Sequence, residues 1–127
     1  MYPANLKREF WTVFGNYMKP VLGSSMQKVN WINYNTGNRN VVFKIYFTAN
    51  EATVEVVLSQ SAKQLLLSLW DHDISFMENE HGNLIITKAD VNIFERSTWP
   101  QAISFLKNSL IKLDEFWVNH KDFFGMG

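Results

Sequence analysis

The chain has 127 residues, of which 46% are hydrophobic and none is cysteine. This length suits one domain with its own core, so we expect a single domain over residues 1–127. The absence of cysteine excludes disulfide frameworks, thiolate nucleophiles and zinc sites built on sulfur. Twelve basic and twelve acidic residues give a formal net charge of zero, which argues against polyanion binding through bulk charge.

Aromatic residues make up 15% of the chain, with ten phenylalanines, five tryptophans and four tyrosines. Because aromatic side chains bury a large area each, a small domain uses them to fill its core or to anchor an interface. For any one ring, core packing is the more common role. The sequence shows neither a signal-peptide pattern nor an apolar run long enough to span a membrane, so we expect a cytoplasmic protein.

The first part of the chain predicts a helix followed by a strand. Apolar residues between positions 5 and 19 recur at the spacing of one helical face, and Pro20 and Gly23 end the pattern. The apolar positions of this helix are Leu6, Phe10, Val13, Phe14, Tyr17 and Met18. Residues 29–35 are rich in strand formers and lead into a turn signal at residues 35–38. We therefore expect a hairpin at this point.

Two further strands and a short helix should come next. Residues 41–48 alternate strictly along the chain, and residues 53–58 repeat the alternation, which is typical of half-buried strands. Residues 59–70 change to a helical period, with Ser61 as the candidate N-cap. The pattern predicts antiparallel strands followed by a helix of about two turns.

A second hairpin and a long helix complete the predicted order. Residues 74–80 and 84–91 resemble strands joined through Gly82, since glycine readily takes the positive φ of a tight turn. The last helix should begin near Thr98, which has capping-box spacing to a glutamine three residues later, and Pro100 falls in its first turn. The apolar stripe of this helix comprises Ile103, Phe105, Leu106, Leu110, Leu113, Phe116, Trp117, His120 and Phe124.

The resulting order is α-β-β-β-α-β-β-α. An antiparallel sheet of about five strands with helices on one face accounts for this order and for the half-buried alternation of the strands. The predicted fold class is therefore α+β. No internal repeat, low-complexity tract or charge run marks a linker.

Several long, aromatic-rich segments carry a resemblance to a known family. They are REFWTVFGNYM at residues 8–18, NWINYNTG at residues 30–37, Ile93-Phe94, Trp99-Pro100, Ile103-Ser104-Phe105 and LDEFW at residues 113–117. In this order they resemble the bacterial family called domain of unknown function 4268. The chain departs from the family after the third strand, where the family has a longer helical stretch. The resemblance implies no catalytic residues, although longer relatives with a nuclease-like domain imply a nucleic-acid or defence context.

The residues needed for metal-dependent nuclease chemistry do not appear at the required spacing. A restriction-endonuclease-like core places an acid two residues before a lysine on a strand, but Glu55 is followed by valines and Glu51 by Thr53 at that distance. The acids and histidines that suit a metal are Asp71, His72, Asp73, Glu78, Glu80 and His81. A polar loop and a solvated hairpin tip explain them more simply, and we predict no metal ligands.

Other catalytic patterns are also missing from the sequence. The glycines never adopt a phosphate-loop or dinucleotide spacing, and Gly23-Ser24-Ser25 follows a helix instead of forming a nucleophile elbow. His120 lies on the apolar stripe of the last helix, where packing or capping is the ordinary role. We therefore expect no cofactor and name no catalytic residue.

The most promising surface lies around the first predicted hairpin, where asparagines are poor strand formers and aromatic residues lie among them. The candidate binding residues are Asn30, Trp31, Asn33, Tyr34, Asn35, Arg39 and Lys44. Turn capping by the amides and inward packing of the rings would explain the same residues structurally. A polar and aromatic surface able to contact a partner would explain them functionally.

The sequence thus favours a non-enzymatic protein-interaction or self-assembly module. We expect a protein partner or a second copy of the chain more readily than nucleic acid, and neither a membrane nor a small-molecule ligand is indicated. The alternative is a nucleic-acid-associated accessory domain without nuclease activity. It depends on the basic residues of the N-terminal half, among them Lys28, Arg39 and Lys44.

Overall fold

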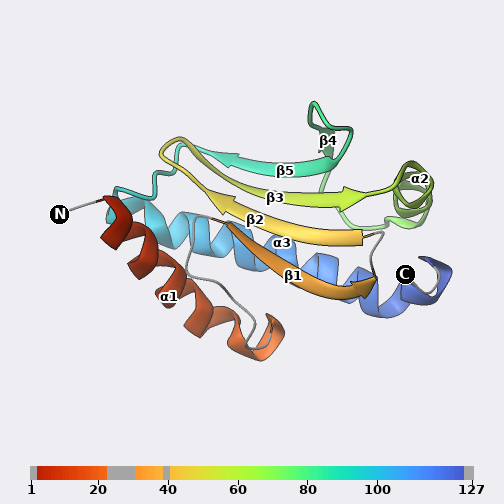
Figure 1. The fold of residues 1–127 in the computed structure, drawn as a ribbon, viewed down its shortest axis with the longest axis horizontal. Helices are drawn as coiled ribbons and strands as arrows, with labels where there is room; N and C mark the ends of the chain where they lie inside the picture. Colours follow the sequence, from red (N-terminus) through yellow and green to blue (C-terminus); the bar gives the residue numbers. More distant parts are fainter. Residues whose placement is uncertain (1–2, 23–30, 39–40, 125–127) are drawn as a thin grey trace.

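The computed structural model describes residues 3–22, 31–38 and 41–124, with the backbone alone for residues 3–5, 16–22 and 31–38. The elements, in chain order, are α1 (Pro3–Leu22), β1 (Trp31–Asn38), β2 (Val41–Phe47), β3 (Glu51–Leu58), α2 (Gln60–Leu69), β4 (Met77–Glu78), β5 (Leu84–Ala89) and α3 (Trp99–His120). Short 3₁₀ turns, η1 (Arg96–Thr98) and η2 (Lys121–Phe124), flank α3. This order confirms the predicted α+β fold (Figure 1).

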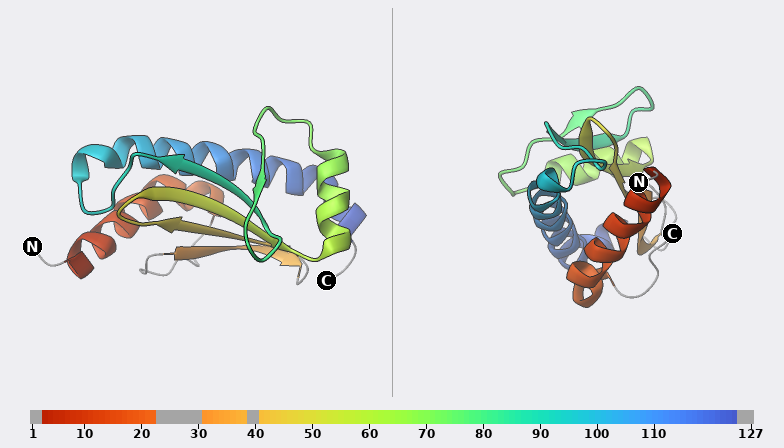
Figure 2. Two further views of the ribbon diagram at one scale, coloured as in Figure 1. Left: turned by 90° about the horizontal axis from the view of Figure 1, so that it is seen from above. Right: turned by 90° about the vertical axis from the view of Figure 1, so that its left-hand side faces the viewer.

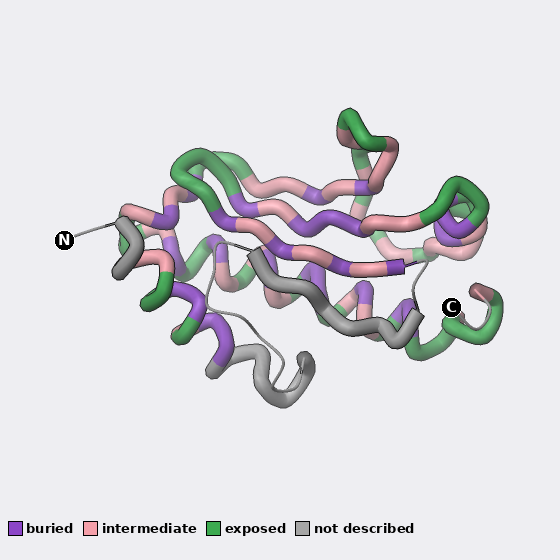
Figure 3. The backbone as a smooth tube through the Cα atoms, viewed as in Figure 1, coloured by how far each residue is buried: buried purple, intermediate pink, exposed green. Residues whose placement is uncertain are grey.

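The strands form one five-stranded antiparallel sheet in the order β1-β2-β3-β5-β4. Alternate residues of β2 are buried and half-buried, as its period of two requires (Figure 3). The register pairs Lys44 with Glu55 and Tyr46 with Thr53, so these residues lie on the same face. The other face carries the buried strand residues Val41, Phe43, Ile45, Phe47, Ala52, Val54, Val56, Leu84 and Ile86.

Helices α1 and α3 cover that buried face, and α2 stands at one end of the sheet (Figure 2). Phe10 of α1 contacts both the sheet and α3. Its ring centroid lies 4.5 Å from that of Phe47 in β2 and 5.3 Å from that of Trp99 in α3. Five residues of the apolar stripe predicted for α3 are buried in the same core: Leu106, Leu110, Leu113, Phe116 and Trp117. Trp99 and Ala102, which the predicted stripe did not include, are buried there too, whereas the predicted Ile103, Phe105 and Phe124 are only partly buried against the core. Among the described helices, none is long and apolar enough to cross a membrane.

Two predicted boundaries in the sheet are wrong. The predicted turn at residues 35–38 belongs to β1, which continues to Asn38 through a register shift after Tyr34. Such a bulge keeps a segment in the ladder despite its turn-forming sequence. The strand predicted at residues 74–80 is only the two-residue β4, because Trp70 Nε1 donates a 2.9 Å hydrogen bond to the carbonyl of Ile74 and holds the preceding segment out of the sheet.

The expected helix caps also differ from the structure. Ser59, and not Ser61, is the N-cap of α2, since its Oγ accepts a hydrogen bond from the backbone N–H of Ala62. Thr98 makes no side-chain cap for α3, because its Oγ1 instead accepts the backbone N–H of Asn92, and its single O–H is shared between the carbonyls of Asn92 and Glu95. Pro100 does fall in the first turn of α3, as predicted.

Candidate interaction surface

The sheet face opposite α1 and α3 carries no described helix, and we call it the helix-free face. It consists of Val42, Lys44, Tyr46, Thr53, Glu55, Val57, Ile85 and Thr87, which the cross-strand register brings together. All of these residues except Glu55 are half-buried. The face therefore mixes three apolar side chains, Val42, Val57 and Ile85, with five that carry polar groups.

Glu55 is the unusual residue of this face, because a carboxylate only 8% exposed lies in the middle of a valine-rich strand. Its Oε1 accepts a 2.9 Å hydrogen bond from the hydroxyl of Tyr46. Its Oε2 accepts hydrogen bonds of 2.6 Å from Asn79 Nδ2 and 3.0 Å from Asn83 Nδ2. Each carboxylate oxygen thus has a partner, as a buried charge requires.

The network changes the acidity of both titratable partners. Burial raises the pKa of Glu55, but the hydrogen bonds from Tyr46, Asn83 and Asn79, with the positive charge of Lys44, outweigh burial and hold this pKa below its ordinary value of 4.5. Burial, the hydrogen bond to Glu55 and the negative charge of Glu55 raise the pKa of Tyr46 from 10.0 to about 12. At neutral pH the pair is therefore a carboxylate held by a neutral phenol.

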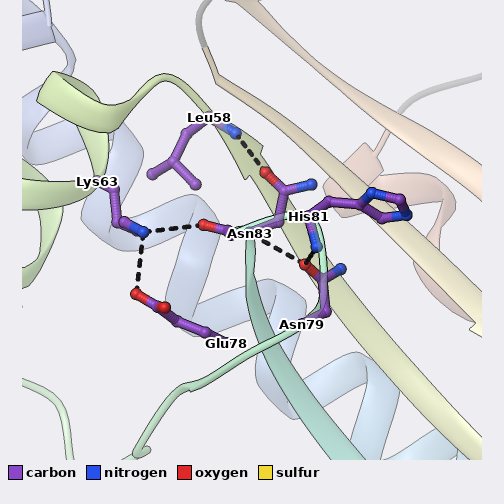
Figure 4. A network of polar contacts seen from close by, with 7 residues as sticks. Leu58, Lys63, Glu78, Asn79, His81 and Asn83 are labelled. Carbon is purple, nitrogen blue, oxygen red and sulfur yellow. Dashed lines mark hydrogen bonds and ion pairs between the residues drawn. The ribbon is translucent and has the colours of Figure 1, made fainter.

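The turn between β4 and β5 brings the two asparagines onto the sheet (Figure 4). Asn79 Oδ1 accepts from the backbone N–H groups of His81 and Asn83, and Asn83 Oδ1 accepts from the N–H of Leu58. Gly82 has a φ of 77° in this turn, as its predicted role requires. The side-chain amides of Asn79 and Asn83 therefore both shape the turn and attach it to β3.

Lys63 of α2 supports the same turn from its other side. Its ammonium donates to Gly82 O at 3.0 Å and to Glu78 Oε1 at 2.9 Å, and the residue is 8% exposed. The imidazole of His81 points away from Lys63 (Figure 4). The turn is thus held between a buried anion on the sheet and a buried cation on α2.

Of the predicted binding residues, those that the structure describes lie on β1 and β2. Asn30 and Arg39 lie outside the described residues, whereas Trp31, Asn33, Tyr34 and Asn35 belong to β1, whose side chains are not described. The register places Trp31 opposite Tyr46 and Asn33 opposite Lys44. Lys44 itself lies on the helix-free face, so β1 and this residue are neighbours, as their proximity in the sequence suggests.

Two of the acids considered as metal ligands, Asp73 and Glu78, form ion pairs with two different lysines. Lys112 lies 2.8 Å from Asp73, and its hydrogen bond and positive charge lower the pKa of Asp73. Glu78 pairs with Lys63 instead. In residues 3–22, 31–38 and 41–124, no three His, Asp or Glu side chains gather as a metal site would require.

His120 of α3 packs against the helix that carries it. Its ring stacks on that of Phe116 with the two centroids 4.5 Å apart, and its Nδ1 lies 2.9 Å from the backbone carbonyl oxygen of Phe116.

Sequence reasoning missed the Glu55 network. Its donors come from Tyr46, nine residues before Glu55, and from Asn79 and Asn83, which follow it by 24 and 28 residues. The available signal was a glutamate with a valine on each side, Val54 and Val56, near the centre of a strand. Such a residue needs partners, but a sequence of this kind does not say which ones.

The family model described as Domain of unknown function (DUF4268) matches the chain over residues 6–78 and 63–121. The two segments overlap and together contain each of the described strands, all of α2 and α3 and most of α1. No curated protein and no solved structure matches the chain significantly. The extent of the family match agrees with the aromatic-rich segments at both ends, and the chain belongs to the DUF4268 family.

Proposed function

We propose that this domain is a non-enzymatic self-assembly module, in which the sheet of one copy continues into a second copy through β1. The observation that carries the proposal is the composition of this edge strand. β1 has eight residues, WINYNTGN, with no charged residue and no proline. In the described part of the chain it pairs with β2 alone.

An edge strand exposes a row of unpaired backbone N–H and C=O groups to any other strand. Proteins usually protect such edges with lysine, proline or very short strands. The opposite edge of this sheet follows that rule, because β4 has only two residues and the uncovered end of β5 carries Lys88. The composition of β1 provides no such protection, and its register shift comes only after Tyr34, so the regular segment Trp31–Tyr34 is open to antiparallel pairing with a second β1 about a two-fold axis.

The chemistry of the helix-free face supports binding more than catalysis. Its buried carboxylate, Glu55, already accepts three hydrogen bonds from Tyr46, Asn79 and Asn83. A carboxylate held in this way is poorly suited to take a proton from a substrate. The remaining half-buried residues, such as Val42, Val57 and Ile85, offer apolar contact area beside the edge.

Sedimentation equilibrium over a wide concentration range tests the proposal. We expect a concentration-dependent dimer for the natural chain and a monomer for the double variant Asn33→Glu and Asn35→Glu. Position 33 lies opposite Lys44 within one copy, so a glutamate there does not repel its own neighbour on β2. In antiparallel pairs the introduced glutamates of the two copies come close together, and like charges across paired strands are destabilising.

The matched control adds the same charge elsewhere, with Gln60→Glu in the first turn of α2 and Gln101→Glu in the first turn of α3, where both positions are exposed. This control should remain dimeric, and circular dichroism should show that both variants fold. A natural chain that is monomeric at every concentration, or an unchanged dimer in the β1 variant, would refute the proposal.

The nucleic-acid alternative receives no comparable support from the described residues. Lys7 and Arg8 lie on α1, which covers one face of the sheet, whereas Lys44 lies on the opposite face beside Glu55. These positive charges therefore do not form one continuous surface, which a phosphate backbone would need.

A further inference from the structure

A cleft of about 430 Å³ lies between α1 and the first half of α3, on the side of the molecule away from the helix-free face. Its lining includes Val13 of α1, Arg96 of η1, and Trp99, Ile103, Ser104 and Lys107 of α3. Clefts of roughly 300–1,000 Å³ are typical of sites for small organic ligands. The cleft lies near the lower end of that range, so it suits a small ligand.

The lining combines an apolar wall with positive charge. Val13, Trp99 and Ile103 provide apolar surface, whereas Arg96 and Lys107 are cations and Ser104 provides a hydroxyl. Among the described lining residues none is acidic. A ligand complementary to this cleft has an apolar ring and a negative charge at one end.

Arg96 is already oriented for a carboxylate. Its guanidinium carbon lies 5.8 Å from the ring centroid of Trp99, within the range of a cation–π contact. Arg96 Nε donates a 3.0 Å hydrogen bond to Glu9 Oε2, and the terminal Nη2 donates to the same oxygen. The guanidinium of Arg96 thus already binds one carboxylate, that of Glu9.

The contact between Arg96 and Glu9 is exchangeable. The two side chains are 51% and 44% exposed, and an exposed ion pair contributes only about 0.2–1 kcal/mol to stability. Glu9 lies one helical turn before Val13 on α1, so its carboxylate approaches Arg96 from the rim of the cleft. An incoming carboxylate can therefore take its place at small cost.

We propose that this cleft binds a small aromatic carboxylate, whose ring packs against Val13, Trp99 and Ile103 and whose carboxylate displaces Glu9 from Arg96. Lys107 adds positive charge on the same side of the ligand. Glu9 then acts as an internal competitor that occupies the arginine until the ligand arrives. This proposal is independent of the β1 interface.

The experiment is an NMR titration of the full chain with 2-naphthoate, monitored at the indole N–H of Trp99. This N–H donates a 2.9 Å hydrogen bond to the carbonyl of Ile93, so it reports on the cleft wall from within the fold. Saturable shifts are expected with 2-naphthoate. The neutral analogue 2-naphthylmethanol should bind at least about tenfold more weakly, because it lacks the charge-assisted hydrogen bonds.

Two substitutions of the same ion pair should act in opposite directions. Arg96→Gln should weaken 2-naphthoate binding by at least about tenfold, whereas Glu9→Gln should strengthen it by up to about fivefold, because the competitor is gone. Both variants lose the same ion pair, so any common effect on folding cancels in the comparison. The proposal is overturned if Trp99 does not shift, if the alcohol binds equally well, or if both variants weaken binding.

Discussion

Glu55 is the residue whose ionisation should control the stability of the helix-free face. Its pKa is lower in the folded chain than its ordinary value of 4.5, so the charged form is favoured by folding. Its contribution to the free energy of unfolding is therefore fully present above the unfolded pKa and is lost as the pH falls through the folded pKa. Urea unfolding between pH 7 and pH 3 should show this loss in the natural chain.

Glu55→Gln should reduce that pH dependence. The amide keeps an oxygen for the two asparagine donors and can donate to the hydroxyl of Tyr46, so the cost at pH 7 should be about 1–3 kcal/mol. Glu51→Gln is the matched control, because this glutamate is exposed on the same strand and should leave the pH profile unchanged. Equal acid sensitivity in Glu55→Gln and the natural chain would show that Glu55 is not the titrating group.

At the scale of elements, the β4–β5 turn depends on the cation that α2 supplies. Lys63→Met keeps most of the apolar stem but removes the ammonium, which leaves the carbonyl of Gly82 without this donor at a cost of about 1–3 kcal/mol. The substitution should increase the rate of amide hydrogen exchange in residues 79–83 and should change the rate in β2 much less. Chemical denaturation should show the accompanying loss of stability.

Lys112→Met removes a different lysine contact and is the natural comparison. Its partner Asp73 is highly exposed, so solvent already screens the pair and little change in unfolding is expected. If the two lysine variants behaved alike, the buried position of Lys63 would have no special effect on the turn.

The same elements show what a sequence does and does not predict. The alternation in β2 and the apolar stripe of α3 follow from the periods of a strand and a helix, so both were predictable. The cap of α2 was misplaced by two residues, because Ser59 and Ser61 both suit the role and only backbone geometry distinguishes them. The partners of Glu55 required knowledge of which turn folds onto which strand, and that depends on the whole sheet. For the β1 residues of the candidate surface, the register supplies neighbours but leaves their binding role as a prediction.

At the scale of the whole molecule, Phe10 joins α1, the sheet and α3 through a cluster of rings. Phe10→Ala should lower the free energy of unfolding by about 3–5 kcal/mol, since it leaves a cavity among Phe14, Phe47 and Trp99. Domains of this kind are stable by only about 5–15 kcal/mol in total. A large fall in melting temperature is therefore expected by calorimetry.

Phe123→Ala is the corresponding control, because its ring is 64% exposed. It removes the same side-chain atoms without opening a buried cavity and should leave the melting temperature nearly unchanged. A small effect of Phe10→Ala would mean that α1 contributes little to the common core.

The unequal lengths of the two sheet edges set a limit on how far the molecule can assemble. A subunit with two long, open edges can add neighbours on both sides and grow into a fibre. In this sheet β1 has eight residues, whereas the other edge is divided between the two-residue β4 and the end of β5, where Lys88 lies. If two copies pair through β1, as proposed above, neither keeps a second edge of that kind, so growth is expected to stop at two.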